Sequence, residues 1–436
     1  MIAVWKQMEI TWPLMQRRFQ FIKPLSTQKG ISPACSFKEF SESIQKMLST
    51  HRKLVLVALL CLVALYGRAL TIPLDRGDLA FAHAARKLDA GHLFDFYKRE
   101  YIFAYPPGTL PLCWIALYIS PSGSVFYIVH KALISLFDLA LALLLYNLVY
   151  KTTRSFPVAL ASAGWILFDP TIWRVSTVLG QIDVIYTTFL MGSLWLLKEQ
   201  KLTWSAVTLG LAASVKQPAA IFLPAISAYV VHKNGGRAGL LYFCKAISVF
   251  MLIILPFLVS TPKDFVSMYV YLTPSFSQVI HKITPFAAPQ TTKLGLWAVI
   301  QLIQQKTTLN VGWLASIRFP IFITALILPV PLLYRRDYTL GAAYLLPALS
   351  FILFSPQVSW HYPALLVPFT VYAVAVERHS PVWLTVLLMP MLVRHIFLTQ
   401  PWQSFLAVGV IYITMLAAFL ASIYLTHHSF WRREVV

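Results

Sequence analysis

The chain has 436 residues, of which 58% are apolar and only 12% are charged, and its mean hydropathy is +0.68. These values exclude a soluble globular protein, because apolar runs long enough to cross a hydrocarbon core, about 17–25 residues, recur from Leu54 almost to the C-terminus. The net charge of +20 is spread over many short turns, and this argues against nucleic-acid binding. The sequence predicts an all-α protein, a polytopic bundle of transmembrane helices.

Residues 1–53 precede the first apolar run and are predicted to lie in the cytoplasm. Aromatic residues alternate with cations there, a pattern typical of a segment on the inner leaflet: Trp5, Trp12, Phe19 and Phe21. Alternatively, translation starts at Met47, directly before the first crossing. The segment does not have the order of charges, apolar stretch and small residues that a signal peptide requires.

About 12 crossings are predicted within a transmembrane domain over 54–426, followed by a cytoplasmic tail over 427–436. They are expected at 54–71, 124–150, 155–172, 180–198, 202–215, 218–232, 239–260, 312–333, 339–355, 360–377, 381–398 and 404–426. Lysine and arginine favour the cytoplasmic side of short loops. With both termini in the cytoplasm, the following cationic turns all lie inside: Arg52/Lys53, Lys151/Arg154, Lys198/Lys201, Lys233/Arg237, Arg335/Arg336, Arg378 and Arg432/Arg433.

Two external loops are predicted, at about 71–123 and 261–312. The first contains five of the 16 acidic residues: Asp75, Asp78, Asp89, Asp95 and Glu100. An amphipathic stretch after Gly77 predicts a helix along the outer membrane surface, with Asp78 at or near its N-terminus. A helix cap there is the alternative to a catalytic role for Asp78. The apolar segment from Tyr105 to Ser120 is predicted to be re-entrant or juxtamembrane, because a full crossing would invert every later turn.

Three clusters of polar residues are also predicted at the outer side. Gln181 and Asp183 open one crossing and offer hydrogen bonds to a sugar hydroxyl, or bonds between helices. Lys216 lies at an outer tip against the positive-inside trend, which predicts a negative partner, either a lipid phosphate or a substrate phosphate. His361 lies between two aromatic rings in the turn from Ser355 to Tyr362, an arrangement that suits a saccharide, a pyrophosphate or an interfacial aromatic belt.

The order of these motifs resembles that of the GT-C glycosyltransferases, integral-membrane enzymes that use polyprenyl-phosphate sugars. The chain is most similar to prokaryotic relatives of the GPI-anchor mannosyltransferases and to dolichyl-phosphate-glucose glucosyltransferases. The motifs are Gly77-Asp78, Tyr105-Pro106-Pro107, Lys131 to Asp138, Asp169-Pro170, Gly180-Gln181-Ile182-Asp183 and Lys216-Gln217-Pro218. The chain has Ala104 where many relatives have an acidic residue, and this departure places the catalytic role more heavily on Asp78.

The resemblance implies transfer of a hexose, with mannose favoured, from a polyprenyl-phosphate donor to a lipid-linked or surface glycan on the outer face. Asp78 is the expected general base, in an inverting reaction. The expected substrate-binding residues are Lys216 and His361 for the donor phosphate, Gln181 and Asp183 for positioning, and, by resemblance, Tyr105 and Gln217. The first loop lacks an Asp-x-Asp pair, so no metal ion is predicted, and no cofactor is expected.

Two other functions fit the composition. A transporter or flippase has the same topology, although no repeat relates the two halves and the acidic residues gather at the outer face. A scaffold that lacks chemistry is the third hypothesis. No Asn-x-Ser/Thr site occurs in the chain, which favours a bacterial or archaeal plasma membrane over the endoplasmic reticulum.

Overall fold

The computed structural model describes residues 33–72, 79–99, 105–120, 123–265, 296–297, 299–300, 314–328, 330, 339–355 and 362–377. Every regular element in these ranges is a helix, so the predicted all-α class is confirmed. The chain divides into two units, residues 1–58 and 59–436. The packing described below lies within the second unit.

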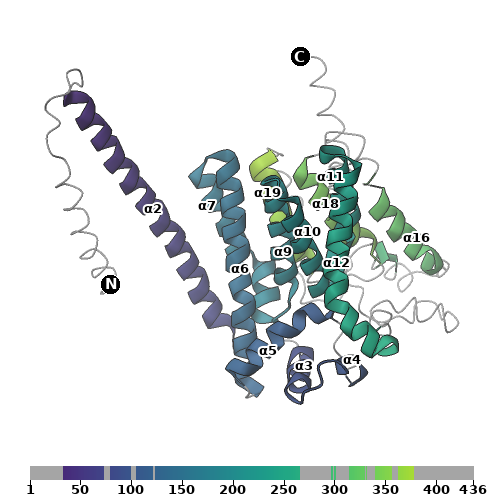
Figure 1. Ribbon diagram of the computed structural model, residues 1–436. Coiled ribbons are helices and arrows are strands. Elements are labelled where there is room, and N and C mark those ends of the chain that lie inside the picture. The colour runs from purple at the N-terminus through teal and green to yellow at the C-terminus, as the bar shows by residue number, and fades with distance from the viewer. Residues whose placement is uncertain are drawn as a thin grey trace. The chain divides into compact units, whose positions relative to one another are not determined.

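Three helices contain stretches that are long and apolar enough to cross a membrane (Figure 1): α2 (Pro33–Thr71), α6 (Gly123–Thr153) and α12 (Gly236–Ser260). The stretches are His51–Thr71, Val125–Thr153 and Gly236–Ser260, of 21, 29 and 25 residues. At about 1.5 Å per residue each is longer than a hydrocarbon core of about 30 Å. The chain is therefore an integral membrane protein.

Shorter helices fill the rest of the bundle. They are α7 (Phe156–Phe168), α9 (Asp183–Lys198), α10 (Leu202–Val215), α11 (Phe222–Asn234), α16 (Leu314–Ile327), α18 (Leu340–Phe354) and α19 (Leu366–Glu377). Each crossing predicted before residue 378 contains one of the described helices. The segments predicted at 381–398 and 404–426 lie outside the described residues, and the number of crossings stays a prediction.

The first predicted external loop folds into short helices. They are α3 (Leu79–Asp89), α4 (Phe96–Arg99), η2 (Pro107–Thr109) and α5 (Leu110–Ile119). The amphipathic pattern after Gly77 does form a helix: α3 buries Phe81, Ala84 and Ala85. The ten residues of α5 rise by only about 15 Å, half of a hydrocarbon core, so this helix cannot cross a bilayer by itself.

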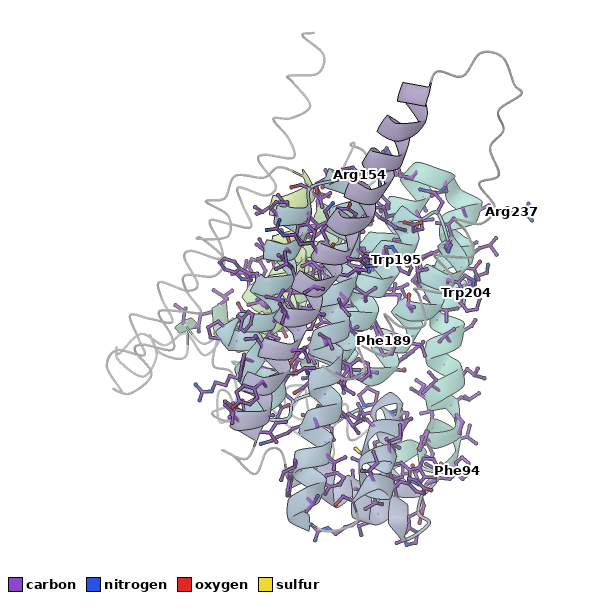
Figure 2. All side chains as sticks on the ribbon, turned by 90° about the vertical axis from the view of Figure 1, so that its left-hand side faces the viewer. Phe94, Arg154, Phe189, Trp195, Trp204 and Arg237 are labelled. Carbon is purple, nitrogen blue, oxygen red and sulfur yellow. The ribbon has the colours of Figure 1, made fainter. Side chains whose placement is uncertain are left out.

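Two contacts and three labelled residues distinguish the two ends of the helices. In Figure 2, Phe94 lies at one end, and Arg154 and Arg237 lie at the other. The hydroxyl of Ser260, at the C-terminus of α12, donates a hydrogen bond of 2.6 Å to the carbonyl oxygen of Phe94. At the opposite end the Lys151 ammonium contacts the Glu199 carboxylate at 2.8 Å. The start of α9 therefore lies at the Phe94 end, away from the cationic turns.

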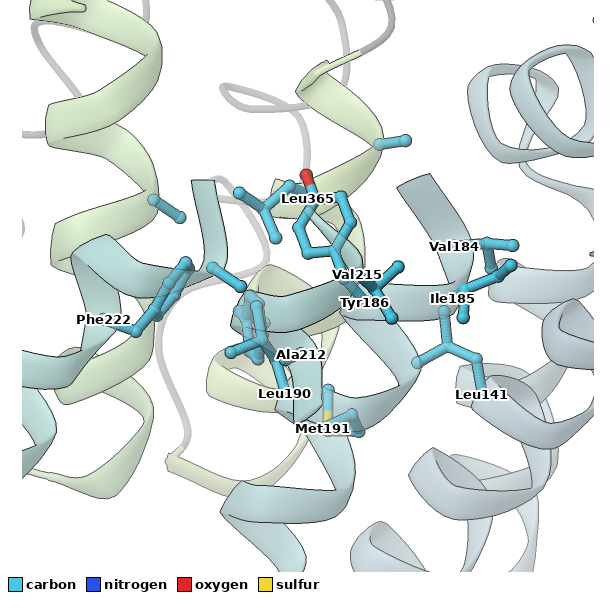
Figure 3. Packing of buried hydrophobic residues seen from close by; sticks show 14 of the residues in the cluster. Leu141, Val184, Ile185, Tyr186, Leu190, Met191, Ala212, Val215, Phe222 and Leu365 are labelled. Carbon is cyan, nitrogen blue, oxygen red and sulfur yellow. The ribbon is translucent and has the colours of Figure 1, made fainter. Parts of the chain in front are cut away.

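A continuous apolar core joins the helices. Figure 3 shows part of it, with residues from α6, α9, α10 and η5 (Tyr362–Leu365): Leu141, Val184, Ile185, Tyr186, Leu190, Met191, Ala212, Val215 and Leu365. Tyr186 is fully buried among them. Because α9 packs against α6, α10 and η5, polar residues at its N-terminus reach three other parts of the chain.

Candidate functional site

A buried ion pair joins the start of α9 to the end of α10. The Lys216 ammonium lies 2.9 Å from both carboxylate oxygens of Asp183, and both side chains are at least 97% buried. Two charges at this depth are stable only when they compensate one another. The prediction was that a lipid phosphate or a substrate phosphate faces Lys216; the negative group beside it in the structure is the Asp183 carboxylate.

The backbone around Lys216 aims its side chain out of α10. The helix ends at Val215, and Lys216 is extended, with φ −152° and ψ 133°. The next turn, η4 (Gln217–Ile221), has Pro218 in its first positions, where the missing amide hydrogen costs nothing. The Lys216 side chain therefore leaves the axis of α10 and reaches Asp183.

Three aromatic rings surround the ammonium of Lys216. Its Nζ lies 4.7 Å from the ring centroid of Tyr362, 5.6 Å from that of Tyr105 and 5.9 Å from that of Tyr186. These distances suit cation–π attraction, which strengthens where water is excluded. Tyr362, the last residue of the turn predicted from Ser355 to Tyr362, therefore lies against Lys216.

The Tyr-Pro-Pro segment packs against the same site. The Tyr105 hydroxyl donates to the Gln181 side-chain oxygen at 3.0 Å, and the Tyr105 ring stacks on Phe81 of α3 at 5.0 Å. Gly108 permits this approach, because an added Cβ would lie 2.5 Å from the Ser214 carbonyl oxygen. The turn before α9, the end of α10 and the start of α3 thus meet around Tyr105.

A second cationic side chain lies beside this cluster. Gly180 has φ +67°, and a Cβ there would lie 3.1 Å from Lys131 Cγ and 3.7 Å from His130 Nδ1. The Lys131 ammonium donates to the Ile72 carbonyl oxygen at 3.1 Å. The buried His130 ring lies 4.6 Å from that of Phe81. The tight turn before Gln181 therefore depends on a residue without a side chain.

A further buried ion pair connects α2, α6 and α7. Arg68 donates from Nε to Asp138 Oδ2 at 2.9 Å and from Nη1 to the Leu167 carbonyl oxygen at 2.8 Å. Ser176, in the π-helical turn η3 (Arg174–Val178), donates to the same carboxylate oxygen at 2.6 Å. The guanidinium carbon of Arg68 lies 4.6 Å from the centroid of the Trp173 ring. This network fixes the end of α2.

The structure brings four of the predicted site residues together: Tyr105, Gln181, Asp183 and Lys216. Gln217 is the next residue in the chain and begins η4. Asp78 and His361 lie outside the described residues. Asp169 caps α8 (Pro170–Trp173), since its carboxylate accepts from the amides of Thr171 and Ile172 at 2.9 and 3.0 Å. In the described part of the chain, no group of three or more His, Cys, Asp or Glu is arranged to hold a metal ion.

The comparisons with known proteins identify the family. Residues 103–356 match the family model described as glycosyltransferase family 87. The chain belongs to glycosyltransferase family 87. This membership confirms the resemblance to GT-C glycosyltransferases and makes the chain a membrane glycosyltransferase.

Among solved structures, this chain is similar to ArnT from Cupriavidus metallidurans. The ArnT crystal structure contains bound undecaprenyl phosphate. The two are 15% identical, the match covers 85% of this chain and 77% of that one, and the TM-score is 0.47. No curated protein matches the chain.

Sequence reasoning did not single out Arg68, His130 or Tyr186, and it named Asp138 only as the end of a family motif, not as part of a buried polar cluster. A signal for two of them was present: Arg68 and Asp138 are charges inside apolar runs, which are costly unless they are paired. The partner of each charge was not readable, because Arg68 and Asp138 are 70 residues apart. His130 and Tyr186 resemble ordinary residues of a helical core, and the sequence holds no signal for them.

Proposed function

We propose that the chain transfers a hexose, with mannose favoured, from a polyprenyl-phosphate donor to a lipid-linked or surface glycan on the outer face of the membrane. Family membership gives the reaction class, a glycosyl transfer. The donor follows from the location, because sugar nucleotides are cytosolic and a site at the outer face needs a sugar delivered through the bilayer. The lipid tail keeps such a donor at the membrane surface.

The meeting of Tyr105, Gln181, Asp183 and Lys216 at one end of the helices is the observation that carries this proposal. The four residues come from three separate stretches of the chain. The cluster combines charged groups, amide groups and aromatic faces, as a site for a phosphosugar requires. It lies at the end of the bundle opposite the cationic turns, which the positive-inside rule assigns to the cytoplasm.

In the proposed reaction, Asp78 removes the proton from an acceptor hydroxyl. The acceptor oxygen attacks the anomeric carbon from the face opposite the phosphate, and the bond from this carbon to the phosphate oxygen breaks. Polyprenyl phosphate leaves with the electron pair, and the anomeric centre is inverted. A positioned base contributes about 10²–10⁴-fold to such a step, and cationic groups at the leaving oxygen contribute further.

The binding residues divide the remaining tasks. Lys216 and His361 interact with the donor phosphate, while Gln181, Asp183, Tyr105 and Gln217 position the substrates. The contact with Asp183 orients the Lys216 ammonium before the donor arrives, which lowers the ordering cost of binding. Phe81, three residues after Asp78, stacks on Tyr105, so the chain segment that contains Asp78 continues directly into a helix packed on this cluster.

The test is Asp78→Asn in the full-length protein. The amide keeps the size and much of the capping ability of the carboxylate but removes its basicity, so transfer of radiolabelled sugar from a polyprenyl-phosphate donor should fall at least about 100-fold. Donor binding and stability in detergent should stay near wild type. A mere helix cap predicts a stability loss of about 1 kcal/mol with transfer retained.

Asp75→Asn and Asp89→Asn are the matched controls from the same loop and should retain most of the transfer. Robust transfer by Asp78→Asn would remove this residue as the base. Movement of the labelled sugar across the membrane by the wild type, with no new glycosidic bond, would instead favour the transporter hypothesis.

A further inference from the structure

Two successive prolines limit how the backbone of the Tyr-Pro-Pro segment can be held in place. Pro106 and Pro107 have no amide hydrogen, so over these two residues the backbone can be fixed only through its carbonyl oxygens. A residue before proline is also restricted to extended backbone, and Pro106 has φ −60° and ψ 157°. The segment is therefore stiff, and a donor that binds one of its carbonyl oxygens orients the neighbouring residues as well.

Tyr97, in the short helix α4, supplies such a donor. Its hydroxyl donates a hydrogen bond of 2.8 Å to the Tyr105 carbonyl oxygen. This oxygen and the Pro106 nitrogen belong to the same planar peptide group. The bond therefore fixes the plane between Tyr105 and Pro106, directly beside the Cα atom that carries the Tyr105 ring.

The Tyr97 side chain is itself held against the end of α12. It is only 2% exposed, and its ring makes edge-to-face contacts with Phe257 at 5.7 Å and with Phe265 at 5.0 Å. Such pairs are favourable at centroid distances of about 4.5–7 Å. Ser260 also bonds to the carbonyl oxygen of Phe94, which shortly precedes Tyr97 in the chain. The Tyr97 hydroxyl therefore has a fixed position relative to α12.

The Tyr105 side chain contacts two of the residues proposed to bind the substrate. Its hydroxyl donates to Gln181, and its ring centroid lies 5.6 Å from Lys216 Nζ. The side chain and the carbonyl group leave the backbone at adjacent atoms, so a change in the direction of the carbonyl would disturb both contacts. We propose that Tyr97 is a positioning residue that acts through Tyr105 and holds its ring beside the Lys216 ammonium. This role rests on the proposed function, in which Lys216 interacts with the donor phosphate.

The test is Tyr97→Phe in the full-length protein, which removes the hydroxyl and keeps the ring contacts. Binding of radiolabelled polyprenyl-phosphate mannose is measured in detergent, and its dissociation constant should rise about tenfold, as expected for the loss of one orienting hydrogen bond. Transfer of the labelled mannose in isolated membranes should show the same rise in the donor KM. The maximal rate should stay within about threefold of wild type, because the hydroxyl acts on donor binding.

A second variant separates positioning from a general loss of structure. Tyr105→Leu removes the ring, so in that background Tyr97 has no ring to position, and adding Tyr97→Phe should change donor affinity by less than about twofold. Effects of residues that act together are not additive, whereas independent effects add. If Tyr105→Leu fails to fold, the double variant Lys216→Met/Asp183→Leu replaces it as the background, because the ring then has no ammonium to face.

The matched control is Tyr242→Phe in α12. The Tyr242 hydroxyl is buried and lies 3.3 Å from Ser193 Oγ and 3.0 Å from Ser205 Oγ. Ser193 is ten residues after Asp183 in α9, so this hydroxyl group lies about 15 Å along the helix from the candidate site. Tyr242→Phe should therefore lose a buried hydrogen bond, as Tyr97→Phe does, and keep the donor affinity of the wild type.

Three outcomes would overturn the role of Tyr97 and leave the proposed function intact. One is wild-type donor affinity in Tyr97→Phe. Another is an equal loss of affinity with and without the Tyr105 ring, and the third is an equal loss in Tyr242→Phe, since either would reduce Tyr97 to a structural role. A wild-type protein that neither binds polyprenyl-phosphate mannose nor transfers its sugar would instead contradict the proposed function, and the role of Tyr97 with it.

Discussion

The charges of Lys216 and Asp183 compensate one another, so substitutions at both positions are needed to separate a structural role of Lys216 from a role in donor binding. Lys216→Met removes the cation and leaves a buried carboxylate without compensation, which should cost about 3–5 kcal/mol of stability. Thermal unfolding of the detergent-solubilised protein measures this loss. Sugar transfer would fall with it, so the single variant does not separate a structural role from contact with the donor.

The double variant Lys216→Met/Asp183→Leu makes that separation. Replacing both charges with apolar groups of similar size is often neutral for stability, so the double variant should unfold near the wild-type temperature. If Lys216 contacts the donor phosphate, apparent donor affinity should still be about ten- to a hundredfold weaker, the equivalent of one charge-assisted hydrogen bond of about 1.5–3 kcal/mol. Wild-type donor affinity in the double variant would show that neither Lys216 nor Asp183 contacts the donor, and that the two charges serve only one another.

At Gly180, the addition of a single Cβ atom is expected to lower the stability of the protein. Its φ of +67° lies in the left-handed region, and an added Cβ would lie 3.1 Å from Lys131 Cγ. Gly180→Ala should lower the free energy of unfolding by about 1–2 kcal/mol from backbone strain alone. Gly192→Ala, inside α9 with no atom within 4 Å of the new Cβ, is the control and should be neutral or stabilising. Equal stability of the two variants would contradict the importance of the Gly180 turn.

At the scale of elements, the Asp138 network joins three helices through one carboxylate. Asp138→Leu should cost about 3–5 kcal/mol, because Arg68 would remain buried as a charge without its partner. Thermal unfolding of the full-length variant, which retains α2, measures this loss of stability. The matched control is Asp95→Leu, whose carboxylate is 37% exposed and pairs with His92 at 3.3 Å, and it should lose less than about 1 kcal/mol.

The helices were largely predictable from the sequence, and the contacts between them were not. The segment predicted at 202–215 coincides with α10 because Lys201 and the Lys216-Gln217-Pro218 turn mark both ends. The start of α9 is three residues later than predicted, since Gly180 and Gln181 belong to a tight turn. The bond from Tyr105 to Gln181 links residues 76 apart and depends on the close approach at Gly108, which no local pattern reveals.

For the candidate site, the sequence predicted the residues better than their partners. Gln181, Asp183 and Lys216 were selected one by one from helix ends and charge placement, Tyr105 was selected by the family resemblance, and the four residues do meet. The contact between Lys216 and Asp183 was not predicted, because each residue alone also fits a cap or a lipid-facing role. The rings of Tyr186 and Tyr362 around the ammonium depend on helix packing, so they appear only in the folded chain.

For the whole molecule, the location of the candidate site depends on the orientation of α12. This helix has 25 residues and is about 37 Å long, enough to separate its two ends by a bilayer core. It begins beside Gly235, at the cationic end, and its last residue, Ser260, contacts Phe94 at the end that contains the site. We therefore expect Asp95 and Gly235 to lie on opposite faces of the membrane.

An epitope inserted after Gly235 should be accessible only from the cytoplasm, and one inserted at Asp95 only from outside, when intact cells and inverted vesicles are probed with the same antibody. The exposed cations at 233 and 237 orient the turn inward, because moving them across the membrane is opposed by the positive-inside bias. Both insertions fall in turns, exposed at Gly235 and partly exposed at Asp95, so expression should be near wild type. Labelling of both positions from one side would contradict the predicted topology, and with it the assignment of Tyr105, Gln181, Asp183 and Lys216 to the outer face.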